Sequence, residues 1–242
     1  MPALLLIAHG SRDPRHAATV AALVEEVRAR RPGIEVATAY LDHCAPRIPQ
    51  VVGRLADAVA VPLLLNRAFH AKHDIPAALR AAGSRLPVAD VLGPSPLLLA
   101  ALDRRLAEAG VDTGCPAVRA RTGVVLAAAG SSDPAADAAT RAVAAEWRRT
   151  RGWAAVEVAY ASAAGPRVPD ALAALRAAGA AHTAVAPYLL APGLLPDRIA
   201  AAAHGADTVA DPLGPAPELA ALLLERYDEA RRAARAVPAL TA

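Results

Sequence analysis

The sequence predicts an α/β protein of two flavodoxin-like, doubly wound domains, each a parallel sheet with helices on both faces. Three observations lead to this fold class: apolar runs of strand length, helical segments between them, and a repeat of the whole pattern in the second half. Apolar residues that run on without alternation are typical of parallel strands buried on both faces. Right-handed crossovers between such strands place helices on both sides of the sheet.

Each half alternates the two kinds of element in the same order. In the first half the strands are expected at residues 3–8, 35–40, 59–65 and 88–91, and the helices at 15–31, 47–57, 75–82 and 96–109. In the second half the strands are expected near residues 123–128, 156–161, 183–190 and 207–210. Asp13-Pro14 and Asp133-Pro134 mark helix starts, because Asp is a preferred N-cap and Pro suits the first helical position.

Blocks of sequence that recur in one order reveal the repeat. His9-Gly10-Ser11-Arg12-Asp13-Pro14 aligns with Ala129-Gly130-Ser131-Ser132-Asp133-Pro134, an offset of 129 − 9 = 120. Tyr40 and Pro46-Arg47 recur at the same offset, and Leu92-Gly93-Pro94 recurs as Leu213-Gly214-Pro215 at 213 − 92 = 121. We therefore expect an N-terminal domain over residues 1–112, a linker over 113–122 and a C-terminal repeat over 123–242.

The composition excludes several classes of protein. The net charge of +3, from 26 basic and 23 acidic residues, is too even for a nucleic-acid binder, and 3% aromatic residues are too few for base stacking. Cys44 and Cys115 lack the spacing of a zinc or iron–sulfur site and fit a reducing compartment. The apolar N-terminal run is too short for a signal peptide or a membrane span. These features predict a cytoplasmic protein with no nucleic-acid or membrane partner.

Ionisable residues gather where three expected strands of the first half end. In open parallel sheets, ligands bind beyond these carboxyl ends, so side chains there should face one crevice. The residues that follow the three strands are His9 after the first, Asp42 and His43 after the second, and Arg67, His70, Lys72 and His73 after the third.

The second repeat serves as an internal control for these residues. His9 is replaced by Ala129 and Asp42 by Ser162, while the His70 loop becomes Pro192-Gly193-Leu194-Leu195, with no ionisable group. The fold therefore does not require the histidines, and their presence in one half alone points to function. Asp13-Pro14, which recurs, is explained by architecture.

Histidine suits one particular chemistry at such a site. Neutral imidazole binds first-row divalent metals and also accepts protons near neutral pH, and metallation of a macrocycle needs both abilities. His9, His70 and Asp42 are the candidate metal ligands, and Asp42 is equally compatible with a turn former. Structural interpretations also stay open for His9, as a residue bonded to the adjacent turn, and for His70 and His73, as solvated loop residues. Candidates for substrate binding are Ser11, Arg12, Arg67, Lys72, His73 and Arg198, of which the basic side chains suit carboxylates.

Two motifs carry a resemblance to a known family. His9-Gly10-Ser11-Arg12 and Phe69-His70-Ala71-Lys72-His73-Asp74-Ile75-Pro76 resemble the sirohydrochlorin chelatases of the CbiX/SirB family, which are class II tetrapyrrole chelatases. In the second half, Gly130-Ser131-Ser132-Asp133-Pro134 and Pro187-Tyr188-Leu189-Leu190 fit the two-domain members. The resemblance covers nearly the whole chain, to about residue 230.

The resemblance implies a metal-inserting enzyme that binds its tetrapyrrole between two domains. It implies that His9 and His70 bind metal and accept protons, and it places Asp42 where the family often has a glutamate. It also implies that the divalent metal is a substrate and that no organic cofactor is needed. The His-Ala-Lys-His-Asp-Ile-Pro form is similar to iron-inserting members, which favours Fe²⁺ and a siroheme product.

The sequence is also compatible with other functions. The chief alternative uses the same substrate with Co²⁺, as a cobaltochelatase of cobalamin biosynthesis, and Ni²⁺ is used by single-domain archaeal forms. A non-catalytic metal or tetrapyrrole carrier is a further alternative. Phosphoryl transfer by His9 is disfavoured, because Ala8 stands where such enzymes need an arginine. A monomer and a homodimer are both compatible with the sequence.

Overall fold

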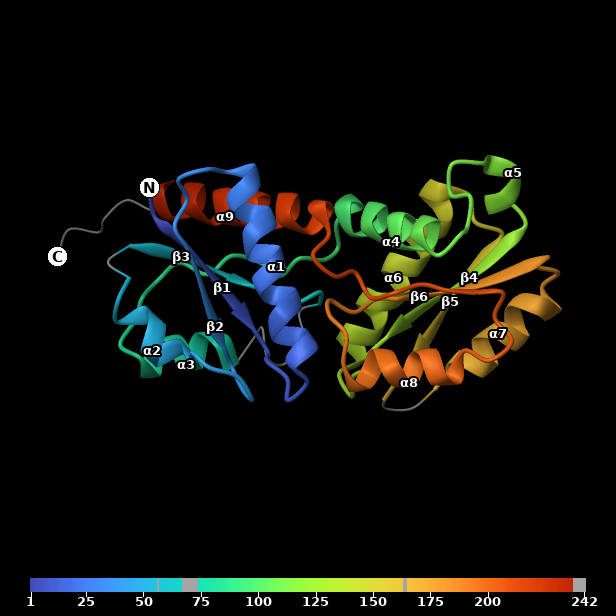
Figure 1. The fold of residues 1–242 in the computed structure, drawn as a ribbon, viewed down its shortest axis with the longest axis horizontal. Helices are drawn as coiled ribbons and strands as arrows, with labels where there is room; N and C mark the ends of the chain where they lie inside the picture. Colours follow the sequence, from blue (N-terminus) through green and yellow to red (C-terminus); the bar gives the residue numbers. More distant parts are fainter. Residues whose placement is uncertain (56, 67–73, 163–164, 237–242) are drawn as a thin grey trace. The chain divides into compact units, whose positions relative to one another are not determined.

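The computed structural model describes residues 1–55, 57–66, 74–162 and 165–236. The chain divides into two compact units (Figure 1). Unit 1 comprises Met1–Ser95 and Pro215–Ala242, and unit 2 comprises Pro96–Gly214. Each unit is a parallel sheet with helices, so the predicted α/β class is confirmed.

Unit 1 is built on a three-stranded sheet of order β2-β1-β3. Its strands are β1 (Ala3–Ala8), β2 (Val36–Tyr40) and β3 (Ala58–Pro62), and its helices are α1 (Pro14–Arg30), α2 (Ile48–Val52), α3 (Ile75–Ala81) and α9 (Pro217–Ala236). Leu5 and Ile7 of β1 belong to a core cluster with residues of α2 and α3. Leu4 and Leu6 are equally buried, which confirms that both faces of the central strand are covered.

Unit 2 is built on a four-stranded sheet of order β5-β4-β6-β7. Its strands are β4 (Thr122–Ala128), β5 (Ala155–Tyr160), β6 (His182–Pro187) and β7 (Thr208–Val209). Its helices are α4 (Pro96–Glu108), α5 (Pro116–Arg119), α6 (Pro134–Arg151), α7 (Val168–Ala177) and α8 (Leu194–Ala202). Among the described residues, no helix has both the length and the apolar character needed to cross a membrane.

The helix starts predicted from Asp-Pro are confirmed in both units. Asp13 accepts a hydrogen bond from the backbone N–H of Arg15 at 2.9 Å, and Pro14 opens α1. Asp133 does the same for Ala135 at 2.9 Å, and Pro134 opens α6. The carboxylate satisfies a donor that the first helical turn leaves without a partner.

Two expected elements of the first half differ from the structure. The strand expected at 88–91 is reduced to a single bridge between Ala60 and Val88, so the sheet has three strands. The helix expected at 47–57 ends at Val52. Pro87 lacks the N–H that would extend the ladder, and Gly53 interrupts the helix, so both elements are shortened at residues that weaken regular structure.

The packing units differ from the domains expected from the repeat. Helix α4 is the last helix of the first repeat in sequence, but it packs against β6 in unit 2. There Asp103 accepts hydrogen bonds from Trp147 Nε1 and forms an ion pair with Arg151, each at 2.8 Å. The residues expected as a linker, 113–122, also hold α5 and the first residue of β4.

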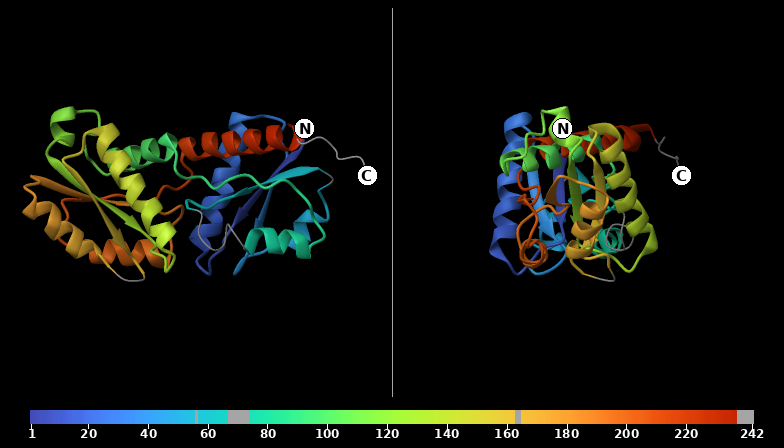
Figure 2. Two further views of the ribbon diagram at one scale, coloured as in Figure 1. Left: turned by 180° about the vertical axis from the view of Figure 1, so that it is seen from behind. Right: turned by 90° about the vertical axis from the view of Figure 1, so that its right-hand side faces the viewer.

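Helix α9 makes the reciprocal arrangement at the end of the chain. It packs against α1 and β3 of unit 1, as Figures 1 and 2 show. Tyr227 donates its hydroxyl to the carbonyl of Pro2 at 2.5 Å, and Arg31 pairs with Asp228 at 2.7 Å. Helix α9, from the second repeat, therefore completes the unit that contains β1.

Equivalent arginines hold the two helices in the same way. Arg105 of α4 donates to the carbonyl of Leu213 at 3.1 Å, and Arg226 of α9 donates to the carbonyl of Leu92 at 3.2 Å. The offsets agree, because 226 − 105 = 121 and 213 − 92 = 121. The repeat in sequence thus encodes a repeated contact, although each helix serves the unit built mainly from the other repeat.

The arrangement predicts that a core residue of α9 stabilises the unit that carries His9. Leu223 is fully buried, so Leu223→Ala should lower the free energy of unfolding by about 2–5 kcal/mol. Denaturant unfolding followed by circular dichroism measures this loss. Leu194→Ala is the matched control, since Leu194 is 64% exposed. Equal effects of the two substitutions would contradict the packing of α9.

Candidate functional site

The turns that follow β1 and β2 are bound to each other in unit 1. The backbone N–H of Leu41 donates to Ala8 at 2.9 Å, and that of Asp42 donates to the carbonyl of His9 at 2.8 Å. These bonds continue the pairing of the two parallel strands past their carboxyl ends. His9 and Asp42, predicted to share a crevice, are therefore brought together by the backbone itself.

Gly10 makes this close approach possible. Its φ is +92°, which disfavours a side chain, and a Cβ placed there would overlap the carbonyl oxygen of Asp42. Gly130 has φ +91° in unit 2, where a Cβ would overlap the carbonyl oxygen of Ser162. The glycine of the recurring Gly-Ser block is therefore required by the meeting of the two turns.

Cys44 fastens the same pair of turns through its side chain. Its Sγ accepts from the backbone N–H of Ser11 at 3.4 Å and donates to the carbonyl of Ser11 at 3.0 Å. The Ser11 hydroxyl accepts from the N–H of Asp13 at 3.1 Å, as the Ser131 hydroxyl does from Asp133 at 3.0 Å. Because this contact recurs, the hydroxyl of Ser11 has an architectural role beside its proposed substrate contact.

His9 and His43 are the two histidines that lie at these turns. Nδ1 of His9 lies 3.1 Å from the carbonyl oxygen of Gly10, and the ring is half-buried. The centroids of the His9 and His43 rings are 6.3 Å apart, with planes inclined by 45°. The imidazoles therefore form a pair at the carboxyl ends of β1 and β2, where a ligand is expected.

Asp42 is held by two donors and a histidine ring. Its Oδ1 accepts from the backbone N–H of His43 at 2.8 Å and from Arg47 at 3.0 Å. Its Oδ2 lies 3.4 Å from Nε2 of His43. The hydrogen bond from the His43 backbone, followed by that from Arg47, lowers the pKa of the Asp42 carboxyl below its ordinary value, so the group is a carboxylate at neutral pH.

Arg47 is a site residue that the sequence reasoning missed. Pro46-Arg47 recurs as Pro166-Arg167, and Arg167 indeed donates to the Tyr160 carbonyl at 3.1 Å, as Arg47 does to Leu41 at 2.5 Å. The recurrence pointed to architecture only. The contact with Asp42 belongs to unit 1 alone, because Ser162 stands at the equivalent position.

His16 of α1 is a histidine outside the predicted site, and it lies close enough to His9 for the His9 charge to affect its pKa. Burial lowers the pKa of the His16 imidazole, and the charge of His9 lowers it further. Its Nδ1 is buried and has no hydrogen-bond partner within the described part of the chain. Ala136 fills the equivalent position in α6, so the helix itself does not need an imidazole there.

Several predicted site residues cannot be placed beside this pair. Arg67, His70, Lys72 and His73 lie outside the described residues. Arg12 is exposed in the turn after β1, while Arg198 lies in α8 of unit 2. Across residues 1–55, 57–66, 74–162 and 165–236, no three His, Cys, Asp or Glu side chains are grouped as metal ligands.

Unit 2 shows the same turns without the chemistry. Ser162 donates its backbone N–H to Ala129 at 2.8 Å and its hydroxyl to the same carbonyl at 2.6 Å. No ionisable side chain is needed to close this turn, because Ala129 replaces His9 and Ser162 replaces Asp42. The internal control proposed from the sequence therefore holds at the level of backbone geometry.

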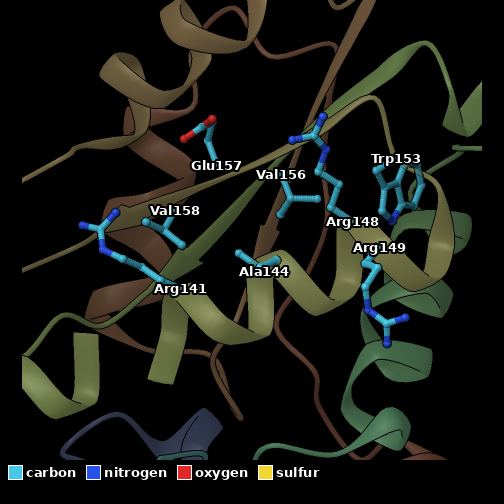
Figure 3. A pocket seen from close by; sticks show the side chains of 9 residues that line it. Arg141, Ala144, Arg148, Arg149, Trp153, Val156, Glu157 and Val158 are labelled. Atoms are coloured by element: carbon cyan, nitrogen blue, oxygen red, sulfur yellow. The ribbon is translucent and has the colours of Figure 1, made fainter. Parts of the chain in front are cut away.

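A groove of about 540 Å³ on unit 2 is a separate feature (Figure 3). It lies between α6 and β5 and is lined by Arg141, Ala144, Ala145, Arg148, Arg149, Trp153, Val156, Glu157 and Val158. Arg141 pairs with Asp137 and Arg149 with Glu146, so acidic neighbours balance two of its arginines. The groove has no histidine and begins near the amino end of β5, so we do not assign metal chemistry to it.

The fold and the site define a class of protein: a two-repeat α/β protein whose ionisable turns occur in one repeat. A family model supports the same two repeats. The chain belongs to the CbiX family, whose model matches residues 3–109 and 123–230.

Curated relatives and a solved structure agree with this membership. The chain is 30% identical over 209 residues to a sirohydrochlorin ferrochelatase of Priestia megaterium, covering 82% of this chain and 77% of the relative. It is 28% identical over 215 residues to a sirohydrochlorin cobaltochelatase of the same organism, covering 82% and 67%. The structure of SirB from Bacillus subtilis with Fe³⁺ matches with a TM-score of 0.80 and 25% identity, covering 97% of this chain and 98% of that one.

The meeting of the turns predicts a strong effect at Gly10. Gly10→Ala should force the turn after β1 away from Asp42 and lower the free energy of unfolding by about 1–3 kcal/mol more than a strained φ alone. Gly33→Ala is the matched control, because Gly33 has φ +84° with open space around it and should cost about 1–2 kcal/mol. Thermal or denaturant unfolding compares the two, and equal losses would show that the turns do not meet as described.

Proposed function

We propose that this chain is a sirohydrochlorin chelatase, an enzyme that inserts a divalent metal ion into sirohydrochlorin. The observation that carries the proposal is the asymmetry of the repeats: the same backbone hydrogen bond joins the turns in both units, but only unit 1 has His9, Asp42 and His43 at them. Relatives named as sirohydrochlorin ferrochelatase and cobaltochelatase support the substrate and the reaction.

Insertion requires two things of the protein. The metal must be bound weakly enough to be released into the macrocycle, and the two pyrrole N–H protons must be accepted as it enters. Neutral imidazole does both near neutral pH, whereas a closed thiolate site would retain the metal. We assign His9 and His70 to metal binding and proton acceptance, with His70 assigned from its sequence motif.

Substrate binding is assigned to side chains that suit the carboxylates of the tetrapyrrole. These are Ser11, Arg12, Arg67, Lys72, His73 and Arg198. Arginine pairs with carboxylates through two parallel hydrogen bonds, which fixes a planar substrate better than a point charge does. The divalent metal is a substrate of the reaction, and no organic cofactor is part of the proposal.

The metal is the open choice within this function. Relatives of comparable identity carry the names of iron and cobalt enzymes, and both ions accept imidazole and carboxylate ligands. The His-Ala-Lys-His-Asp-Ile-Pro motif favours Fe²⁺ and hence siroheme. Cobalt insertion for cobalamin is the second candidate, and a cytoplasmic location stays a prediction from the sequence.

Anaerobic metallation of sirohydrochlorin tests the function directly. Absorbance should show faster metallation with enzyme than without it, with Fe²⁺ and Co²⁺ assayed in parallel. The larger kcat/KM identifies the preferred metal. If the protein binds the metal but does not accelerate metallation, it is a metal or tetrapyrrole carrier and not a chelatase.

Removal of either proposed catalytic histidine should separate activity from folding. We expect His9→Ala and His70→Ala each to lower kcat/KM by about 100-fold or more, since a positioned proton acceptor contributes that much. The unfolding transition of His9→Ala should stay near that of the wild type, because Ala129 fills the equivalent place. His204→Ala, at an exposed position in unit 2, is the control. Unfolding of both site variants would favour a structural role for these histidines.

A further inference from the structure

The backbone of His43 is unusual. Its φ of 60° is the one positive value at a non-glycine residue within the described part of the chain. Residues with a Cβ seldom adopt this left-handed conformation, although histidine tolerates it better than most. In this turn the conformation places the imidazole beside His9, with ring centroids 6.3 Å apart.

This separation suits two ligands of one ion. A nitrogen of histidine lies about 2.0–2.1 Å from a zinc ion that it binds, so two such nitrogens are at most about 4 Å apart. Rotation about χ2 of His9, which is a soft torsion in histidine, can turn a nitrogen of that ring toward the His43 ring. The hydrogen bond between the two turns, from the Asp42 N–H to the His9 carbonyl, holds the backbones in register while the His9 ring rotates.

Asp42 is engaged in a different way from a free metal ligand. Its Oδ1 already accepts from the His43 backbone and from Arg47, and its Oδ2 faces Nε2 of His43 at 3.4 Å. Histidines that bind metals commonly present their second ring nitrogen to a carboxylate, which fixes the tautomer and the ring orientation. Asp42 occupies that orienting position, and Nδ1 of His43 is the nitrogen left for an ion.

We propose that His43, rather than Asp42, supplies the metal-binding group after β2, and that it binds the incoming divalent ion together with His9. Asp42 is then a positioning residue that acts through the His43 ring, and Arg47 holds the carboxylate in place. This inference rests on the proposed function, because it names ligands for the metal that the enzyme inserts.

The assignment changes the chemistry of the site. An imidazole in place of a carboxylate makes the set of ligands for Fe²⁺, Co²⁺ or Ni²⁺ richer in nitrogen, and the set still leaves positions open for the nitrogens of the macrocycle. A carboxylate in direct contact would instead hold a hard ion through oxygen. The exposed position of His43 in its turn is compatible with transfer of the ion to a bound substrate.

Co²⁺ alone, titrated into the full chain, provides the test. His43→Asn removes the imidazole while keeping a residue that tolerates the left-handed conformation, and His43→Gly does the same without a side chain that could bind metal. We expect both to weaken Co²⁺ binding by at least about 10-fold, with an unchanged unfolding midpoint. His204→Asn is the matched control in unit 2 and should bind as the wild type does.

The relative loss of Co²⁺ affinity in two variants shows whether His43 or Asp42 binds the ion. If His43 binds the ion, Asp42→Asn should weaken Co²⁺ binding less than His43→Asn does. The Co²⁺-loaded wild type should also show a paramagnetically shifted imidazole N–H signal in its proton spectrum that His43→Asn lacks and Asp42→Asn keeps. The inference is wrong if Asp42→Asn weakens Co²⁺ binding more than His43→Asn does. It is also wrong if His43→Asn keeps every paramagnetically shifted signal of the wild type.

The metallation assay separates this inference from the function. If the wild type metallates sirohydrochlorin but both His43 variants bind Co²⁺ normally, the His43 assignment is wrong and the proposed function stands. If the His43 variants lose Co²⁺ binding but the wild type does not metallate sirohydrochlorin, the metal site is supported and the proposed function is wrong.

Discussion

The meeting of two backbone turns at Gly10 is the constraint on which the site depends. Parallel strands β1 and β2 end side by side, and the hydrogen bonds that continue past them leave no room for a Cβ at that glycine. The same contact recurs at Gly130 in unit 2. Since backbone hydrogen bonds close the turn without the side chains of His9 and His43, these positions are available for chemistry in unit 1.

Three kinds of contact hold these turns and keep the Asp42 carboxylate charged. Backbone hydrogen bonds fix the turns, Cys44 ties them through Ser11, and Arg47 holds the Asp42 carboxylate. The carboxylate stays ionised because donors surround it, and it lies against the His43 ring.

The stability of this unit depends on a distant part of the chain. Helix α9 covers α1 and β3, with Tyr227 bonded to Pro2 and Asp228 paired with Arg31. Helix α4 packs against β6 of unit 2 in a corresponding way, with Asp103 bonded to Trp147 and paired with Arg151. Each sequence repeat therefore lacks, within its own length, the last helix that its sheet uses, and the two repeats depend on one continuous chain.

The sequence by itself determined the fold class, the helix starts and the asymmetry between repeats, because strand burial, Asp-Pro caps and a missing histidine are local properties. It left Asp42 open as ligand or turn former and did not foresee its bond to Arg47. Only the tertiary structure decided which sheet each of α4 and α9 covers, and that the strand expected at 88–91 forms a single bridge. Those outcomes depend on the packing of residues far apart in the chain, where equivalent apolar helices suit either sheet by pattern and contacts such as Tyr227 with Pro2 choose between them.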